Sequence, residues 1–374
     1  MRKRLTGRMF LAAITMLGLV TFAAGTGNAA PADSTFAWSS PNYVPGVGTS
    51  AAPSMAQCGQ TAYLVWKGVL TDEHLYYTSY SSASGWAAQQ QIVLGNLTDT
   101  APSVSCDSYP LGGSLMLVAW KGIGTDQHVY TTSESAGAGP NAWSAPQQVA
   151  GALTDVSPAA GMVPTDYIIP ASKTAKPAFT IPQVPYLAWK VAGGNAIDYT
   201  AMTNGTWQTP APVPGAFTDV APTMSATLGS TYQADVTWKV AGTTAMQSSV
   251  YDLSVKSWSR PAYVADGGTS TGVSTSDVEM GNAANNGVTA PIAVWKGIGA
   301  DRRLWYSTDA NPPNWATQAL LPSGATTDDN PAVTQYRYPV QGPPGGFSGT
   351  VGAAIVAWRV SDSGIGFSVE TISG

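Results

Sequence analysis

The stretch Leu64-Val65-Trp66-Lys67 is the first of six copies of one pattern, a short β-prone pair followed by a tryptophan and a basic residue. The other copies are Val118-Ala119-Trp120-Lys121, Leu187-Ala188-Trp189-Lys190, Val236-Thr237-Trp238-Lys239, Ala293-Val294-Trp295-Lys296 and Val356-Ala357-Trp358-Arg359. A second set of tryptophans alternates with them: Trp38, Trp86, Trp143, Trp207, Trp258 and Trp315. Self-similarity at a fixed period is the signature of repeat folds, so the repeat is the folding unit.

A proline marks the start of most repeats, 15 or 16 residues after the second-set tryptophan: Pro53, Pro102, Pro158, Pro222 and Pro331, with Val273 in the fifth repeat. A turn such as Gly151-Ala152-Leu153-Thr154-Asp155 precedes it. Each repeat predicts four short strands, A to D. Strand A follows the proline, strand B holds the Trp-Lys pair, strand C resembles Leu75–Thr78, and strand D runs as in Trp143–Val149. Short runs rich in Val, Tyr, Trp and Thr, bounded by Gly and Asp, are typical of strands.

The two ends of the chain indicate how the repeats are arranged. A lone strand D, from Phe36-Ala37-Trp38 to Val44, comes first, and strands A, B and C of the sixth repeat come last. Joined, they complete one unit, close a ring and remove the open sheet edges. The sequence therefore predicts an all-β, six-bladed β-propeller of four-stranded antiparallel blades, closed by the N-terminal strand. An open β-solenoid is the alternative, and it leaves the split repeat unexplained.

The first residues predict export from the cell. Basic residues between Arg2 and Arg8 precede an apolar run from Met9 to about Ala24 and a small-residue site that ends in Ala29-Ala30. This order is typical of a secretory signal peptide, and the run is too short to span a membrane. We expect a signal peptide over residues 1–29, with cleavage after Ala30 as the alternative, and one propeller domain over residues 30–374.

Charge and cysteine content narrow the class of protein. The net charge is −5, and the first 29 residues hold four basic and no acidic side chains, so the exported chain would carry −9. Such a balance, with scattered basic residues, argues against nucleic acid or an anionic membrane as partner. The two cysteines, Cys58 and Cys106, predict one disulfide in an exported chain, and two buried free thiols are the alternative.

Aspartates recur in the turns that the pattern predicts on one face, where the B–C and D–A connections of every blade meet. They are Asp72, Asp126 and Asp301 in B–C turns, and Asp99, Asp155, Asp219 and Asp328 in D–A turns. This ring of carboxylates is the candidate binding site, with Trp305 as a candidate stacking platform. The alternative is that the aspartates cap their own turns by accepting hydrogen bonds from backbone N–H groups.

Other repeated residues have structural explanations. The strand-B lysines could contact a ligand or pair with a nearby aspartate, and the tryptophans are expected to pack between blades. His74 and His128 hold equivalent positions in successive repeats, at least ~10 Å apart, so they cannot share one zinc ion. We predict no metal site and no cofactor. The longest insertions, Met162–Pro185 and Tyr336–Thr350, fall in A–B connections, where they could bind a partner or merely lengthen the loops.

The tandem pattern Ala-Trp-Lys-Gly, Asp, Tyr-Tyr-Thr, Trp and Gly-x-x-Thr-Asp-x-x-Pro resembles the secreted sialidase-like and fucose-lectin-like β-propellers of bacteria and fungi, over about residues 34–374. In sialidases, the resemblance implies an arginine triad, a tyrosine nucleophile and acidic partners. Only five arginines follow the signal peptide, Tyr336-Arg337-Tyr338-Pro339 lies near the wrong end of the chain, and Ser307-Thr308-Asp309 is an imperfect Asp box. In fucose lectins, it implies an arginine, a glutamate and an aromatic residue in each repeat, and the periodic arginine and glutamate are absent.

We therefore expect a secreted, non-catalytic monomer that presents one propeller face to an extracellular protein or a cell-wall polysaccharide. A carbohydrate-binding lectin is the first alternative. A sialidase-like glycoside hydrolase is the second.

Overall fold

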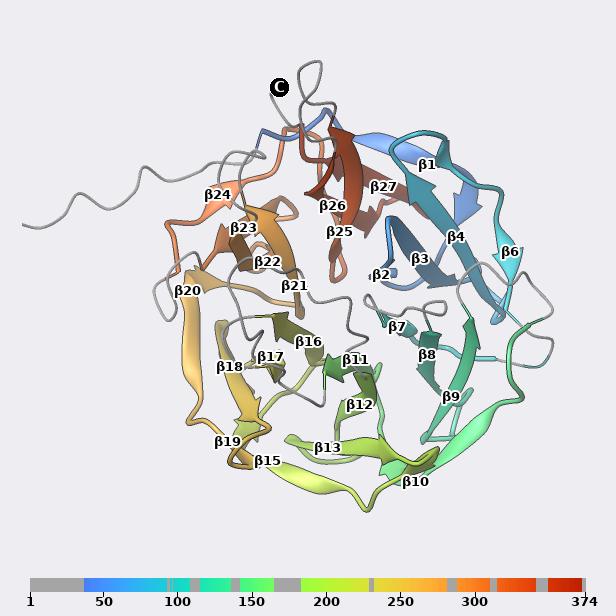
Figure 1. The fold of residues 1–374 in the computed structure, drawn as a ribbon, viewed down its shortest axis with the longest axis vertical. Coiled ribbons are helices and arrows are strands. Elements are labelled where there is room, and N and C mark those ends of the chain that lie inside the picture. Colours follow the sequence, from blue (N-terminus) through green and yellow to red (C-terminus); the bar gives the residue numbers. More distant parts are fainter. Residues whose placement is uncertain are drawn as a thin grey trace, which may run out of the picture. The chain divides into compact units, whose positions relative to one another are not determined.

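The computed structural model describes residues 37–92, 95, 97–107, 115–135, 142–164, 183–228, 232–280, 288–309, 315–340 and 349–371. Within these ranges, the chain forms six antiparallel sheets arranged around a common axis, which confirms the predicted six-bladed propeller (Figure 1). The predicted signal peptide and the centres of both long insertions (165–182 and 341–348) lie outside the described residues. The described part contains no helix that could cross a membrane.

Five blades are continuous in sequence. Blade 1 consists of β2 (Ser54–Cys58), β3 (Thr61–Lys67), β4 (Leu75–Ser81), β5 (Gly85–Trp86) and β6 (Gln90–Gln91). Blade 2 consists of β7 (Ser103–Cys106), β8 (Leu115–Lys121), β9 (His128–Ser135) and β10 (Gln147–Leu153). Blade 3 consists of β11 (Ala159–Pro164), β12 (Gln183–Lys190), β13 (Ala196–Thr203), β14 (Thr206–Trp207) and β15 (Ala211–Phe217). Blade 4 consists of β16 (Thr223–Leu228), β17 (Tyr232–Lys239), β18 (Ala245–Asp252), β19 (Ser257–Trp258) and β20 (Ala262–Gly268). Blade 5 consists of β21 (Val273–Met280), β22 (Val288–Lys296), β23 (Leu304–Thr308) and β24 (Ala319–Leu320).

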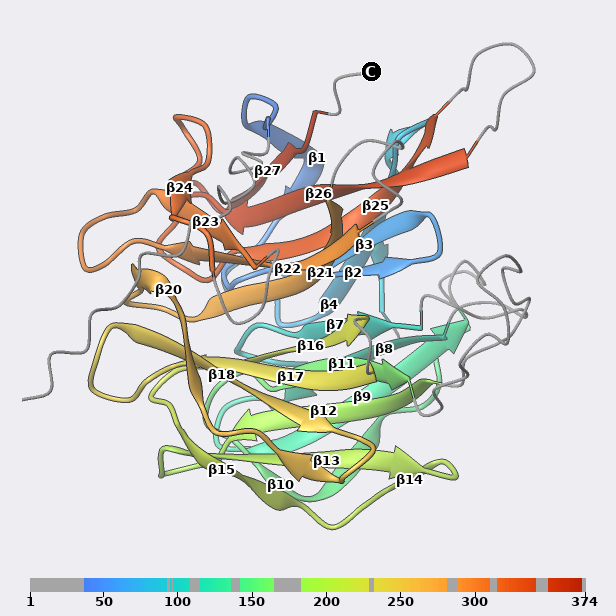
Figure 2. The same ribbon diagram turned by 60° about the vertical axis from the view of Figure 1, so that its left-hand side comes forward.

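Blade 6 is assembled from both ends of the chain. It combines β25 (Ala332–Val340), β26 (Gly349–Arg359) and β27 (Gly364–Val369) with β1 (Asn42–Gly48). Strand β1 pairs antiparallel with β27, with Asn42 opposite Phe367 and Tyr43 opposite Gly366, and Figure 2 shows these two strands together. The N-terminal strand therefore closes the ring as predicted, and an open solenoid is excluded.

Strand D differs from the prediction. In blades 1, 3 and 4 the second-set tryptophan forms a two-residue strand at the far end of strand C, and the chain then breaks before rejoining the sheet. In blade 2 the strand begins at Gln147, four residues after Trp143. The break includes Pro210 in blade 3 and Pro261 in blade 4, and proline has no N–H for a ladder hydrogen bond. The N-terminal strand likewise begins at Asn42, and Trp38 pairs with Glu370 in an isolated bridge outside that strand.

The strand-B tryptophans fill the junctions between blades, as predicted. All six are at most 2% exposed. Each belongs to a hydrophobic cluster that includes residues of the preceding blade; Trp189 of blade 3, for example, clusters with Val129 and Val149 of blade 2. Burial of a large aromatic surface at every junction holds the blades together.

The predicted disulfide is present between Cys58 and Cys106. These residues end β2 and β7, the innermost strands of blades 1 and 2, and their Cα atoms are 5.4 Å apart. The bond therefore ties two neighbouring blades together beside the propeller axis.

Candidate functional site

The predicted face, with its B–C and D–A turns, is organised by one threonine in each D–A turn. The six threonines are completely buried: Thr49, Thr98, Thr154, Thr218, Thr269 and Thr327. The Oγ1 of Thr154 accepts a hydrogen bond from the Val156 N–H, and its own N–H donates to the Gln127 carbonyl oxygen in the B–C turn of the preceding blade. Equivalent backbone bonds occur in all six repeats. The D–A turn is therefore capped by its threonine and joined to the preceding blade by a backbone hydrogen bond.

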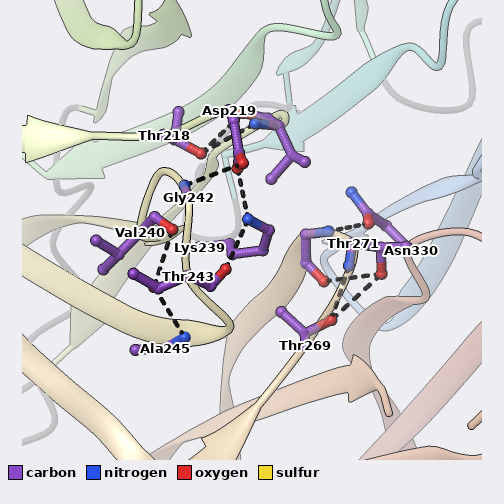
Figure 3. Close-up of polar contacts among 12 residues, drawn as sticks. Thr218, Asp219, Lys239, Val240, Gly242, Thr243, Ala245, Thr269, Thr271 and Asn330 are labelled. Atoms are coloured by element: carbon purple, nitrogen blue, oxygen red, sulfur yellow. Dashed lines mark hydrogen bonds and ion pairs between the residues drawn. The ribbon is translucent and has the colours of Figure 1, made fainter. Parts of the chain in front are cut away.

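The aspartate that follows this threonine anchors the same turn to the next blade. Asp155 Oδ1 accepts a hydrogen bond from Lys190 Nζ at 2.6 Å, and its Oδ2 accepts one from the Gly193 N–H at 3.4 Å. The same pair forms between Asp99 and Lys121 at 2.8 Å. Figure 3 shows it at Asp219, which lies between Lys239 Nζ and the Gly242 N–H. Asp155 and Asp219 also accept a hydrogen bond from their own backbone N–H, so these carboxylates join their own turn to the next blade as well as capping it.

The buried strand-B lysines therefore pair with the D–A aspartates. Pairing with a nearby aspartate was one of the two roles predicted for these lysines, the other being contact with a ligand. The pattern has variants. In blades 1 and 5 a serine replaces the aspartate, and Lys67 and Lys296 donate to Ser50 and Ser270 at 3.0 and 2.9 Å. In blade 6 Arg359 pairs with Asp329, and the predicted site residue Asp328 pairs instead with Arg302 at 2.6 Å.

The B–C aspartates of blades 1 and 2 form identical clusters with a histidine and a tyrosine. Asp72 Oδ1 lies 2.8 Å from His74 Nδ1 and accepts a hydrogen bond from the His74 N–H, and its Oδ2 accepts one from Tyr76 Oη at 2.9 Å. Asp126, His128 and Tyr130 repeat this arrangement, with 2.7 Å between Asp126 Oδ1 and His128 Nδ1. We call the two groups the Asp-His-Tyr clusters. Here the aspartates also cap their own turns.

Blade 5 carries a variant of this cluster with different side chains. Asp301 accepts two side-chain hydrogen bonds from Arg303, at 2.8 and 3.1 Å, and one from Trp305 Nε1 at 3.0 Å. The Arg303 guanidinium carbon lies 5.2 Å from the centre of the Trp305 ring. Trp305, the predicted stacking platform, is half-buried and already has a cation against its ring.

These contacts set the ionisation of the carboxyl groups. Burial raises the pKa of Asp155, but the hydrogen bonds from Lys190 and the Gly193 N–H outweigh it, so that the pKa lies below its ordinary value. The pKa of Asp72 is also lowered, because hydrogen bonds from His74 and Tyr76 outweigh burial. The side chain of Arg303 lowers the pKa of Asp301 strongly. The face therefore carries ionised carboxylates, and those of Asp72 and Asp155 remain about one-third exposed.

Exposed apolar side chains lie between the carboxylates, at the junctions of the blades. Val69 of blade 1 lies so close to Gly48 of blade 6 that a Cβ there would be 2.9 Å from Val69 Cγ1, and Ile298 of blade 5 covers Gly268 of blade 4 in the same way. Other exposed members of this ring are Ile123, Leu153 and Phe217. The face thus combines hydrogen-bonding groups with apolar patches.

The structure brings each predicted D–A aspartate to a cation. Among the described residues, no three His, Cys, Asp or Glu side chains lie close enough to hold a metal ion. Nothing tests whether the predicted aspartates or Trp305 bind a ligand, so that role stays a prediction. The capping role of the threonines was not predicted, although Thr precedes the aspartate or serine in every repeat.

The five arginines that follow the predicted signal peptide lie in different parts of the propeller. Three of the five are used in ion pairs of the turns of blades 5 and 6: Arg302 with Asp328, Arg303 with Asp301, and Arg359 with Asp329. Arg337 lines a cavity formed by β2, β7, β11, β16, β21 and β25, and Arg260 is exposed between β19 and β20.

No family model matches the chain, and no curated protein matches it. Solved structures of propellers do. The fucose-recognising lectin of Aleuria aurantia, described as a six-bladed β-propeller, superposes with a TM-score of 0.53 at 13% identity, over 87% of this chain and 95% of the lectin. The Arthrobotrys oligospora protein AofleA gives 0.57 at 8% identity, over 89% and 87%. The Hadza microbial sialidase Hz136 gives 0.57 at 11% identity, over 87% of this chain and 66% of the sialidase.

Proposed function

We propose that this chain is a carbohydrate-binding propeller that acts outside the cell and does not cleave the sugar. The observation that carries the proposal is the similarity to a fucose-recognising lectin along almost the whole of both chains. Because identity is low and one fold can host many functions, the residues of the face must supply the rest of the argument.

The two Asp-His-Tyr clusters are the best candidates for sugar contacts on this face. In each, the carboxylate engages one imidazole nitrogen, which leaves Nε2 to bond a ligand hydroxyl. The two imidazoles are 42% and 45% exposed, and an exposed apolar side chain, Val69 or Ile123, lies in the same turn. Hydroxyl groups suit the polar atoms, and the C–H face of a sugar ring suits the apolar one.

Repetition of the clusters would strengthen binding to a polymer. One cluster offers few contacts, so its affinity for a single sugar would be low. Two clusters on neighbouring blades can engage one branched or repeating glycan, and the second contact then forms at a high effective concentration.

A glycan array with the mature chain, followed by titration of the best ligand, tests the proposal. We expect saturable binding that free sugar competes away, and at least a tenfold loss of affinity in His74→Ala/His128→Ala. The double variant should keep its unfolding midpoint, because alanine occupies the equivalent positions in blades 3 and 4, Ala196 and Ala245. The control, Arg260→Ala, should bind like the parent.

Two results would overturn the proposal. If no glycan on the array binds saturably, the lectin proposal fails and a protein partner becomes the better explanation. Release of free sugar from a bound glycan would make the chain a hydrolase, the activity named for one of its structural neighbours.

A further inference from the structure

One position near the end of strand C faces the junction with the preceding blade in every repeat. It lies four residues after the strand-C residue that pairs with the strand-B tryptophan. In blades 1, 3 and 4 an aromatic or apolar side chain packs into the junction from this position: Tyr80, Met202 and Tyr251. In blades 2, 5 and 6 the position holds an acid: Glu134, Asp309 and Glu370. Three of the six junctions therefore receive a carboxyl group where the others receive an uncharged side chain.

Glu134 lies between blades 1 and 2 in apolar surroundings. It pairs in register with Met116, whose side chain belongs to the hydrophobic cluster of this junction. The residue is 2% exposed, and neither of its carboxyl oxygens has a hydrogen-bond partner among the described residues. The titratable groups that face it are Tyr63 and Tyr77 of blade 1, whose pKa values are raised by burial and by the charge of Glu134. A carboxylate here loses its hydration and gains no hydrogen bond, so the junction favours the neutral acid.

Asp309 lies between blades 4 and 5 with two further acids. Its N–H donates a hydrogen bond to the Pro291 carbonyl oxygen at 2.9 Å, and Pro291 pairs in register with Asp277. Burial and the charges of Asp277 and Asp309 raise the pKa of Asp235, on blade 4, to about 7. All three acids are at most 9% exposed. Among the described residues, Arg337 of blade 6 is the cation that lines a cavity together with Asp277. One cation does not balance three buried carboxylates, so this junction also favours a protonated acid.

Glu370 lies between blades 5 and 6, next to the bridge that it makes with Trp38. Its Oε2 accepts a hydrogen bond from the Ala354 N–H at 2.9 Å, and both Trp38 and Ala354 belong to the hydrophobic cluster of this junction. Burial outweighs the hydrogen bond and raises the pKa of Glu370 to about 7. The third junction therefore has the same preference as the other two.

We propose that these acids make three of the six blade junctions proton-dependent, closed tightly while the acids are protonated and loosened when they ionise. An acid whose pKa is higher in the folded than in the unfolded chain stabilises the fold at low pH, and this contribution is lost as the pH rises through the folded pKa. For Glu134, Asp235 and Glu370 the loss centres near pH 7. The carboxylates of the other face, such as Asp155, must stay ionised, so stability falls again in strong acid. The propeller is thus most stable in mildly acidic surroundings, whatever its ligand.

Thermal unfolding of the full mature chain at pH 5 and pH 8 tests the proposal. We expect the parent's midpoint to be lower at pH 8 by roughly 3–6 °C. Glu134→Met gives blade 2 the residue that blade 3 has at this position, so it should shrink that fall by at least about a quarter and change the midpoint at pH 5 by less than about 2 °C. The reverse change, Met202→Glu, should enlarge the fall. Asp266→Asn, at an exposed position of β20, should leave it unchanged. All variants keep the same histidines, so each difference from the parent isolates one acid.

Hydrogen–deuterium exchange shows whether the loosening is local. After correction for the intrinsic effect of pH, the amides at the end of β9 should lose at least about tenfold in protection between pH 5 and pH 8. The amides beside Tyr251, in the junction of blades 3 and 4, should change little. Equal losses at both junctions would overturn the proposal, because the opening would then be global.

Two further results would overturn it. If Glu134→Met raises the midpoint equally at both pH values, the gain comes from packing. If Met202→Glu adds no pH dependence, an acid at this position does not control the junction. Should Glu134→Met fail to fold, Glu134→Gln, which keeps the shape of the side chain, replaces it in the same comparison.

Discussion

Leu70 holds a backbone conformation that four other blades give to glycine. Its φ is +52°, and the equivalent residues are Gly124, Gly193, Gly242 and Gly299, with φ between +58° and +72°. The conformation is needed, because Lys67 Nζ donates a hydrogen bond to the Leu70 carbonyl oxygen. A left-handed residue other than glycine is strained, and the Leu70 side chain is 79% exposed and stabilises little.

Leu70→Gly should therefore stabilise the protein. Relief of strain exceeds the extra chain entropy that glycine loses on folding, so we expect the free energy of unfolding to rise by about 0.5–1 kcal/mol. Urea denaturation measures the change. The reverse substitution, Gly124→Leu in blade 2, should lower the free energy of unfolding by a similar amount, and a loss of stability in Leu70→Gly would refute the strain argument.

Glu134 is a buried acid at the junction of blades 1 and 2. Its side chain is almost fully buried, neither carboxyl oxygen has a hydrogen-bond partner among the described residues, and burial raises its pKa to about 7. Its position in the repeat is that of Tyr80, Met202 and Tyr251, which are not acidic. The folded state therefore favours the protonated form of this side chain.

A pH series on Glu134→Gln tests this. Since the folded pKa lies above the ordinary value of 4.5, the folded state binds more protons between about pH 4.5 and pH 7, and the parent loses stability as the pH rises through that window. The variant lacks this group, so at pH 8 it should be more stable than the parent by about 1–2 kcal/mol, and at pH 4 the two should be nearly equal. An equal gain at both pH values would point to packing instead.

At the scale of the elements, each D–A turn joins two blades through its buried threonine and the residue that follows it, as Thr154 and Asp155 do. We call such a pair a clasp. Asp155 holds the ammonium group of Lys190, which is 6% exposed, so Asp155→Ala would leave a buried charge without its carboxylate. We expect a loss of about 2 kcal/mol, reduced from the value for a fully buried pair because the aspartate is one-third exposed. Asp155→Ser should cost less than half of that, because serine makes this contact in blades 1 and 5.

Chemical denaturation of the two variants at pH 7 gives the comparison. An equal cost for alanine and serine would mean that the lysine does not need the contact. Since the pKa of Asp155 is lowered in the folded state, the contribution of the pair should be lost as the pH falls toward the folded pKa, and the parent and Asp155→Ala should converge in acid.

The elements of the propeller also show what could and could not be predicted from the sequence. The repeat predicted the blades, the closure of the ring, the tryptophan packing, the disulfide and the contact between lysine and aspartate, because each is a periodic signal or a pair of unique residues. It did not predict the break in strand D, where Pro210 and Pro261 interrupt the ladder. It gave no sign of Glu134, because the residue at its position of the repeat changes from blade to blade.

At the scale of the molecule, the ring is held shut by the split blade. The two ends of the described chain lie side by side, since the Thr371 N–H donates a hydrogen bond to the Ala37 carbonyl oxygen at 2.6 Å. The split falls in a C–D connection, so β1 is added to a sheet whose other three strands come from the opposite end of the chain. Closure therefore depends on strand pairing within a blade, not only on side-chain packing between blades.

Two circular permutants separate these contributions. In both, a short Gly/Ser linker joins residue 371 to residue 37. Opening the chain between Asn204 and Gly205, in the C–D hairpin of blade 3, recreates the native kind of split and should keep the free energy of unfolding within about 1 kcal/mol of the parent. Opening it between Val220 and Ala221, in a D–A turn, leaves every blade whole and removes the covalent connection between blades 3 and 4. Only side-chain packing and the hydrogen bonds of the Asp219 turn to Lys239 and Gly242 then hold that junction, so this permutant should be less stable than the first by at least about 2 kcal/mol. Equal stabilities in urea denaturation would show that packing at the blade junctions is sufficient to close the ring.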